Sequence, residues 1–405
     1  MRKLFKFTGC FVVIMSFVFS ISFAQKVETI DGVRVVHNGK SGTRGKNPKV
    51  TLELVRTIGV VEAEDENIAF YMPSDIALDS QGNMYILDSG NHRIQKFTSD
   101  GQYITTIGNK GQGPAEFVYP LSLDVDSKGY LHISDPGNQR VQVLKPDGKD
   151  HKTVSFVKDP AGVLRISDSG VMIMGRGGSP FSFSMASFQA KKELPKIIRV
   201  LSPDGDLERD FGDQQDFKDF LVNRVGNRFH FAIDKDKNTY VAFDYQNRIE
   251  KYSPEGKILW RADRELNYST EPPKTKSDFK REGGMIRMRE PQMNRCSSGI
   301  AVDNKGRIWI VNLKRQIKDE EKIEVGVTVT QDAGGARSMG MTVGGNTEVR
   351  ETDMYQLEVY APDGILLGKL PLNQFVDDIR IINNRLFLLD RMRGMQYYEY
   401  KIVED

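Results

Sequence analysis

The chain has 405 residues, of which 39% are apolar and 28% are charged, a balance that suits a packed fold with a water-exposed surface. It carries 57 basic and 55 acidic side chains. Arg2, Lys3 and Lys6 are the basic residues of the first 24, so 54 basic side chains remain beyond them against all 55 acidic ones, and this near-neutral body lacks the broad positive field that nucleic-acid binding needs.

The first 24 residues have the pattern of an export signal. A basic start precedes an almost wholly apolar run at 11–19, and Ser22-Phe23-Ala24 supplies a small-x-small cleavage pattern. The apolar run is too short and too poorly flanked for a spanning helix. The sequence therefore predicts a signal peptide at 1–24 and a protein that is periplasmic or extracellular after cleavage; an uncleaved anchor is the alternative.

An N-terminal extension without a repeat signal follows at residues 25–48. Beyond the signal, Cys296 is the only cysteine, so an internal disulfide is excluded and stability must come from packing. We expect a propeller domain to occupy residues 49–405.

Two segments, 73–101 and 120–148, repeat the same pattern without a gap. Each pair of matching residues is 47 positions apart, which chance does not produce. The recurring residues are Pro73, Asp79, Gly82, Asp88, Gly90, Asn91, Arg93, Gln95, Asp100 and Gly101, matched by Pro120, Asp126, Gly129, Asp135, Gly137, Asn138, Arg140, Gln142, Asp147 and Gly148.

Looser copies follow at 163–205, 229–256, 300–364 and 378–402. Each contains short β-branched and aromatic runs separated by turn residues such as Pro-Asp-Gly, which is typical of a four-stranded antiparallel meander. One meander cannot bury both of its faces, whereas copies stacked around an axis can. The sequence predicts an all-β fold, a six-bladed β-propeller; seven blades remain the alternative, because residues 255–363 span two repeat lengths.

The sixth copy lacks a fourth strand. Leu54–Gly59 has no repeat before it and resembles Tyr103–Gly108, the fourth strand of the first copy. We therefore expect residues of about 51–59 to complete the last blade and to join the two ends of the chain.

At these residues the chain resembles the NHL-repeat family of six-bladed propellers. The resemblance is carried by Gly111-Gln112-Gly113-Pro114-Ala115-Glu116-Phe117 before Pro120, and by the Asp88-x-Gly90-Asn91-x-Arg93 pattern. It implies the fold, but relatives include sensors, scaffolds, RNA-binding domains and a few metal-dependent enzymes. Peptide-amidating lyases of this broad family carry zinc-binding histidines where this chain has Ser74 and Leu121, which argues against that activity.

Residues that recur at one position of several copies are expected to serve the blade and not a ligand. Their carboxylate, amide and guanidinium groups suit turn capping and ties between strands or blades. These structural repeat positions are Asp88, Asn91, Arg93, Asp135, Asn138, Arg140 and Arg248.

Signatures of catalysis, metal binding and cofactor binding are missing from the sequence. The five histidines show no chelating spacing, and nucleophile elbows and phosphate loops are absent. We therefore predict no catalytic residues, no metal and no cofactor. The alternative is a hydrolase or lyase with a divalent ion in the central channel, for which Asp75, His230, Asp377 and Asp378 are the candidate ligands, since they lie near strand-one starts.

Loop lengths point to one face of the disc. In an up-and-down blade, the turns after strands one and three lie on one face, and these are uniformly tight. The connections after strands two and four lie on the other face and include every long insertion, at about 175–195, 213–227, 265–296 and 314–353. Elaborate loops on a rigid scaffold are where recognition usually occurs.

The insertions differ in character. The first carries apolar Phe181 and Phe183, and the third is basic, with Arg287 and Arg289. In the fourth, 324–330 is predicted to pair with 339–343 as an accessory hairpin. The predicted ligand-binding residues are the two phenylalanines and two arginines of these insertions, together with His230 and Asp377 near the channel mouth. The leading interpretation is a non-catalytic binding or sensing scaffold for a protein, peptide or carbohydrate.

Overall fold

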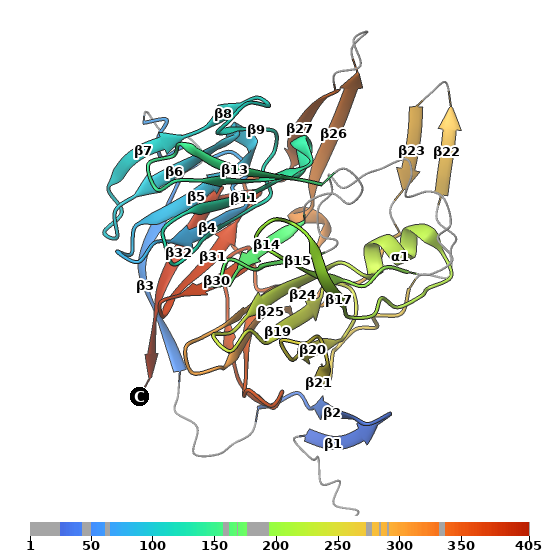
Figure 1. Ribbon diagram of the computed structural model, residues 1–405. Helices are drawn as coiled ribbons and strands as arrows, with labels where there is room; N and C mark the ends of the chain where they lie inside the picture. Colours follow the sequence, from blue (N-terminus) through green and yellow to red (C-terminus); the bar gives the residue numbers. More distant parts are fainter. Residues whose placement is uncertain are drawn as a thin grey trace, which may run out of the picture.

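Six four-stranded antiparallel blades form a β-propeller in the computed structural model; five of them are separate sheets, and the fourth belongs to a six-stranded sheet (Figure 1). The structure describes residues 25–42, 50–60, 65–156, 162–167, 169–175, 194–272, 278–282, 285–289, 291–331 and 337–404, with only the backbone given at 278–282, 285–289, 325–331 and 337–341. This confirms the predicted six-bladed architecture. Among the described residues, no helix is long and apolar enough to cross a membrane.

Each blade is a meander whose strands pair in chain order, apart from the last. In order from strand one to strand four, the blades are β4 (Asp75–Leu78), β5 (Met84–Asp88), β6 (Arg93–Phe97) and β7 (Tyr103–Ile107); β10 (Ser122–Val125), β11 (Leu131–Asp135), β12 (Arg140–Leu144) and β13 (Asp150–Ser155); β14 (Val163–Ile166), β15 (Met172–Gly175), β16 (Ile198–Leu201) and β17 (Leu207–Phe211); β18 (Phe229–Ile233), β19 (Thr239–Phe243), β20 (Ile249–Tyr252) and β21 (Ile258–Arg264); β24 (Ser297–Val302), β25 (Ile308–Leu313), β28 (Tyr355–Tyr360) and β29 (Leu366–Pro371); and β30 (Asp378–Ile382), β31 (Arg385–Asp390), β32 (Gln396–Glu404) and β3 (Val50–Ile58).

The remaining elements lie outside the blades or extend them. They are β1 (Gln25–Ile30), β2 (Val33–Asn38), β8 (Asn109–Lys110), β9 (Glu116–Phe117), α1 (Phe220–Gly226), β22 (Asp278–Glu282), β23 (Met285–Arg289), β26 (Ile323–Gln331) and β27 (Arg337–Gly345), with short 3-10 turns at Ser89–Asn91, Pro136–Asn138 and Asp319–Glu321.

The two ends of the chain meet in the sixth blade, as predicted. β3 pairs antiparallel with β32 from Val50 opposite Glu404 to Ile58 opposite Tyr397. Ile58, the last residue of this strand, is buried. Arg56 lies 3.0 Å from the buried carboxylate of Glu399. The N-terminal strand therefore closes the ring as a clasp.

The extension before the clasp adds a hairpin to the fourth blade, which sequence patterns did not indicate. β1 and β2 pair with each other, and β2 continues the sheet by running parallel to β21. Asn38 links this hairpin to the fifth blade, since its amide donates to Gly364 O at 3.0 Å and its Oδ1 accepts from Leu366 N at 2.8 Å. The chain then passes so close to β29 that a Cβ on Gly42 would lie 2.2 Å from the carbonyl oxygen of Leu367.

The turn between strands one and two is built the same way in four blades. An aspartate accepts two backbone N–H bonds from the turn and a third bond from the side chain six positions on. That third donor is Tyr85, His132, Tyr240 or Trp309, so His132 is part of the turn architecture. Where other blades use glycine with positive φ, the fourth blade places Lys237 at φ 64°.

The core lies between neighbouring blades. Apolar residues from adjacent sheets form continuous clusters, including one that joins the fifth and sixth blades around Trp309, Phe375 and Leu388. The largest buried side chains are aromatic residues of strand two and its neighbours, among them Tyr85, Tyr240 and Phe387. Burial is therefore shared between blades, as radial stacking requires.

The long connections all leave from one end of the blades. α1 lies between β17 and β18, β22–β23 between β21 and β24, and β26–β27 between β25 and β28. Figure 1 shows the two hairpins projecting from the ring in the same direction. The predicted accessory hairpin is confirmed, with Val325 opposite Val343 and Val329 opposite Met339.

The base of the β26–β27 hairpin is fixed to the rim of the ring. Arg315 makes a two-pronged contact with Glu321, at 2.6 and 2.7 Å, and the backbone of Glu321 accepts from Arg393 of the sixth blade. Val343 packs in a cluster with Met72 and Met392. The insertion of the fifth blade therefore contacts the sixth blade near the channel mouth.

Candidate functional site

A cavity of about 270 Å³ opens at the mouth of the central channel, on the face that carries the long connections. Strand one is innermost in each blade, so the first residues of these strands converge on the axis. The strand-one starts of five blades line the cavity through Ser74, Asp75, Leu121, Ser122, Val163, Phe229, His230, Asp377 and Asp378.

The floor of the cavity is a closed network of charges centred on Asp75. The buried Asp75 carboxylate lies 2.9 Å from Arg165 Nη1 and 2.7 Å from Arg380 Nη1. It also accepts the backbone N–H groups of Ile76 and Leu123. This one carboxylate links the first, second, third and sixth blades. Both of its oxygens are engaged in these four contacts.

Above the floor, His230 lies between two carboxylates. Its Nδ1 is 3.3 Å from Asp378 of the sixth blade, and its Nε2 is 3.5 Å from Asp244 at the end of β19. Burial alone would lower the pKa of His230, but these two carboxylates outweigh it and hold the pKa above its usual 6.5. For Asp378, burial acts to raise the pKa, but the imidazolium of His230 brings it below its usual range.

Three further arginines line the mouth, namely Arg228, Arg295 and Arg391. Arg295 Nη2 lies 3.7 Å from Asp244 Oδ2, while its Nε donates to Ser297 O. Arg391 donates its backbone N–H to Asp377 Oδ2 at 2.9 Å, and its guanidinium reaches the carbonyls of Pro73 and Ser74. The mouth therefore presents cationic and anionic groups in alternation.

Of the six residues predicted to bind a ligand, the structure places His230 and Asp377 in the lining of this cavity. Phe181 and Phe183 lie outside the described residues, and Arg287 and Arg289 belong to β23, of which only the backbone is described. Their participation stays a prediction.

Sequence reasoning missed several residues of this cavity. Arg165, which lines the cavity, and Arg380, which contacts Asp75 in its floor, were not singled out. Arg165 is the only charged residue of β14, which was the available signal, whereas β30 carries both Asp378 and Arg380. Asp244 lies one residue after strand two of its blade, where the first blade has Ser89, and only the fold shows that it turns toward His230.

The candidate metal ligands do not form a coordination site. Among the residues that the structure describes, no group of three or more His, Cys, Asp or Glu side chains is arranged to hold a metal ion. Asp75 is occupied by two guanidinium groups, and an oxygen of Asp377 is occupied by the Arg391 N–H. Cys296 is buried, which raises the pKa of its thiol to about 11 and keeps it protonated at neutral pH.

The recurring Asp-x-Gly-Asn-x-Arg residues lie away from the cavity lining. Asp88 accepts from Asn91, Arg93 and Tyr71 N, and Arg93 donates to the carbonyls of Glu66 and Ala69. Asp135, Asn138 and Arg140 repeat this arrangement in the second blade. Arg248 reaches Asp213 O at 2.6 Å and stacks on Phe243. Each set ties strand two or three to the connection that enters its blade.

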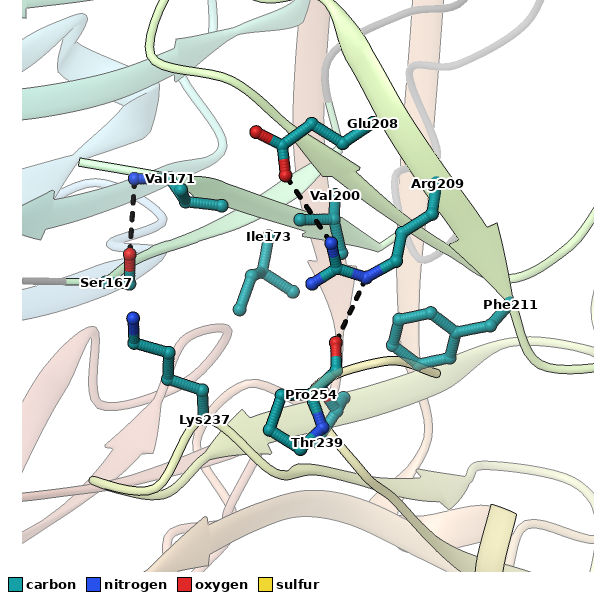
Figure 2. A pocket seen from close by; sticks show the side chains of 10 residues that line it. All are labelled: Ser167, Val171, Ile173, Val200, Glu208, Arg209, Phe211, Lys237, Thr239 and Pro254. Atoms are coloured by element: carbon teal, nitrogen blue, oxygen red, sulfur yellow. Dashed lines mark hydrogen bonds and ion pairs between the residues drawn. The ribbon is translucent and has the colours of Figure 1, made fainter. Parts of the chain in front are cut away.

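A smaller cavity of about 80 Å³ lies between the third and fourth blades, away from the channel (Figure 2). Its wall combines Ile173, Val200 and Phe211 with the stems of charged residues, and Arg209 closes it by donating to Pro254 O at 3.0 Å. Glu208 pairs with Arg209, and Ser167 accepts from Val171 N, so we interpret this small space as a packing gap between blades.

Comparison with known proteins supports the fold. A family model described as a 6-bladed beta-propeller, DUF5128, matches residues 61–150. A member of the DUF4221 family from Bacteroides vulgatus is similar in structure, with a TM-score of 0.53, 10% identity and coverage of 88% of this chain and 99% of that one. A Bacteroides fragilis protein described as exported has a TM-score of 0.50, 10% identity and coverage of 87% and 88%.

A gluconolactonase from Xanthomonas campestris is also similar, with a TM-score of 0.48, 14% identity and coverage of 87% of this chain and 90% of that one. No curated protein matches the sequence. At these identities the structural likeness shows the fold alone, so function must be argued from the channel mouth.

The raised pKa of His230 predicts a pH-dependent contribution to stability. Because protonation is favoured in the folded state, the stabilisation that His230 provides is fully present below pH 6.5 and is lost as the pH rises through the higher folded-state pKa. Urea unfolding of the wild type and His230→Gln at several pH values should therefore show a difference that shrinks from pH 6 to pH 9. Asp244→Asn should move this loss to lower pH, and a difference that grows with pH would contradict the assignment.

Proposed function

We propose that this protein is a non-catalytic binding or sensing scaffold whose ligand site is the channel-mouth cavity on the loop-bearing face. The observation that carries the proposal is the position of this cavity. It is lined from five blades, rests on a rigid floor around Asp75, and lies on the face from which every long connection leaves. A concave site with a few convergent polar groups on such a scaffold is the usual form of a small-ligand site.

The non-catalytic part of the proposal is supported by the chemistry of the same residues. His230 is held between two carboxylates, and the described part of the chain offers no activated nucleophile beside it. Ser74 shares its hydroxyl with Ser89, and Ser122 accepts from Leu164 N. The site has charged groups that can hold a ligand but no nucleophile–base pair.

The proposed export of the protein and the proposed NHL type of its repeats rest on the sequence. The signal pattern at 1–24 supports export to the periplasm or the cell exterior, and the two Bacteroides structures include one described as exported. The spacing of the repeat around Asp88 and Asp135 supports assignment of the blades to the NHL type. The ligand is a partner presented outside the cytoplasm, and nucleic acid is not among the expected partners.

Ligand retention tests the function without assuming a ligand class. Purified protein is dialysed against the small-molecule extract of its host, and retained compounds are identified by mass spectrometry. We expect the wild type to retain one or more compounds at least about tenfold above the Asp244→Asn/Arg295→Met variant, since the variant removes one carboxylate and one guanidinium from the mouth.

Two results would contradict the proposal. Equal retention by the wild type and the variant would show that the cavity is not the site. Consumption of a retained compound with the appearance of a new product would show an enzyme. Circular dichroism of both proteins serves as the folding control.

A further inference from the structure

The charges at the channel mouth alternate in sign along a row of side chains from the fourth, fifth and sixth blades. Arg295 precedes the fifth blade and faces Asp244, Asp244 faces His230, and His230 faces Asp378 of the sixth blade. The successive distances are 3.7, 3.5 and 3.3 Å. Arg391 and Asp377 continue the alternation on the sixth blade.

These contacts are longer than two of the structural ion pairs of the same protein. Asp75 lies 2.7 Å from Arg380, and Asp88 lies 2.8 Å from Arg93, both at ordinary charge-assisted hydrogen-bond length. Asp244 is buried, with 7% of its surface exposed, and its Oδ1 has His230 Nε2 at 3.5 Å but makes no hydrogen bond within the described part of the chain. Buried polar atoms are nearly always paired, so this oxygen has an acceptor position that a ligand hydroxyl can use.

The mixture of signs favours an uncharged ligand. An anion would meet the carboxylates of Asp244, Asp377 and Asp378, and a cation would meet Arg228, His230, Arg295 and Arg391. A zwitterionic ligand would need the carboxylates of the site in one region and its cationic side chains in another. In this cavity, neighbouring side chains carry opposite charges. A hydroxyl group both donates and accepts, so adjacent hydroxyls can bridge each carboxylate and the cation next to it.

The rest of the lining fits the same ligand chemistry. Phe229, Tyr245 and Met392 contribute apolar surface beside the polar groups, which suits the C–H faces of a ring. The cavity of about 270 Å³ lies just below the range of roughly 300–1,000 Å³ that is usual for drug-sized ligands, so it accommodates a small ring compound.

We propose that the channel-mouth cavity binds an uncharged polyhydroxylated ligand, a sugar of one or two rings, with Asp244 accepting from a ligand hydroxyl and Arg295 and His230 donating to neighbouring oxygens. The inference rests on the proposed function and specifies its ligand class.

Calorimetry with defined probes tests it. The probes are neutral hexoses, pentoses, N-acetylhexosamines and their disaccharides, with gluconate, glucosamine and glycine as the anionic, cationic and zwitterionic comparisons. We expect at least one neutral sugar to bind the wild type, at least about tenfold more tightly than any charged probe. Asp244→Asn should weaken that binding at least about tenfold, because it replaces a charge-assisted acceptor.

Asp263→Asn is the matched control. It makes the same chemical change at a carboxylate that pairs with His37 on the outer edge of the fourth blade, so sugar affinity should be unchanged. Tightest binding by gluconate, glucosamine or glycine, equal affinity in Asp244→Asn, or no binding by any neutral sugar would overturn the ligand class. If the host extract still yields a retained compound of another class, the binding function stands and only this inference fails.

Discussion

Deletion of residues 1–64 should abolish cooperative folding, because it removes the clasp strand β3. Without β3, β32 becomes an exposed edge, Glu399 loses Arg56, and the packing of Ile58 in the interface between the first and sixth blades disappears. We expect a loss of more than about 5 kcal/mol, comparable with the whole stability of many domains. Urea unfolding followed by fluorescence of the buried Trp260 and Trp309 measures it.

Deletion of residues 1–49 is the control for the clasp. It removes the β1–β2 hairpin and leaves β3 in place, so the ring should still close with a smaller loss of stability. Equal urea midpoints for the full chain and the chain without β3 would refute closure as the source of stability.

Asp75→Ala should cost about 3–5 kcal/mol, because it leaves Arg165 buried without its carboxylate and leaves Arg380 with only the longer contact to Asp124 at 3.5 Å. The same change removes the acceptor of Leu123 N, which belongs to the neighbouring blade. The free energy of unfolding in urea reports the loss.

The triple variant Asp75→Leu/Arg165→Met/Arg380→Met tests whether the loss of stability in Asp75→Ala comes from uncompensated buried charge or from lost contacts. Since replacing a whole buried ion network with apolar residues is often close to neutral, this variant should recover most of the stability. A triple variant as unstable as Asp75→Ala would contradict the view that uncompensated charge is the cause.

The fold could be predicted because propeller repeats leave strong local signals. The 47-residue spacing between Asp88 and Asp135 fixed the repeat length, and the resemblance of Leu54–Gly59 to a fourth strand located the clasp. Even the β26–β27 hairpin could be predicted, since its alternating valines flank a glycine turn. The β1–β2 hairpin could not, because its partner β21 is some 220 residues away and pairs with it in parallel.

The site was only partly predictable, because a propeller assembles it from distant positions. His230 and Asp377 were accessible from their places at strand-one starts. Asp244 and Arg295 follow strand two and precede strand one of adjacent blades, so only the radial arrangement brings them together. Recurrence separated the structural repeat residues from the site candidates, but Arg165 and Arg380 were not considered, although they occupy the same strand position in two different blades.

The clasp also has a kinetic consequence. β3 is made early in synthesis, yet its partner β32 lies almost 350 residues later, so these contacts have a very high sequence separation. The entropy of closing that loop must be lost before the pairing is gained, which makes such contacts slow to form. Blades one to five can assemble from local pairings as the chain emerges, whereas the last blade must wait for the complete polypeptide, with β3 unpaired until then.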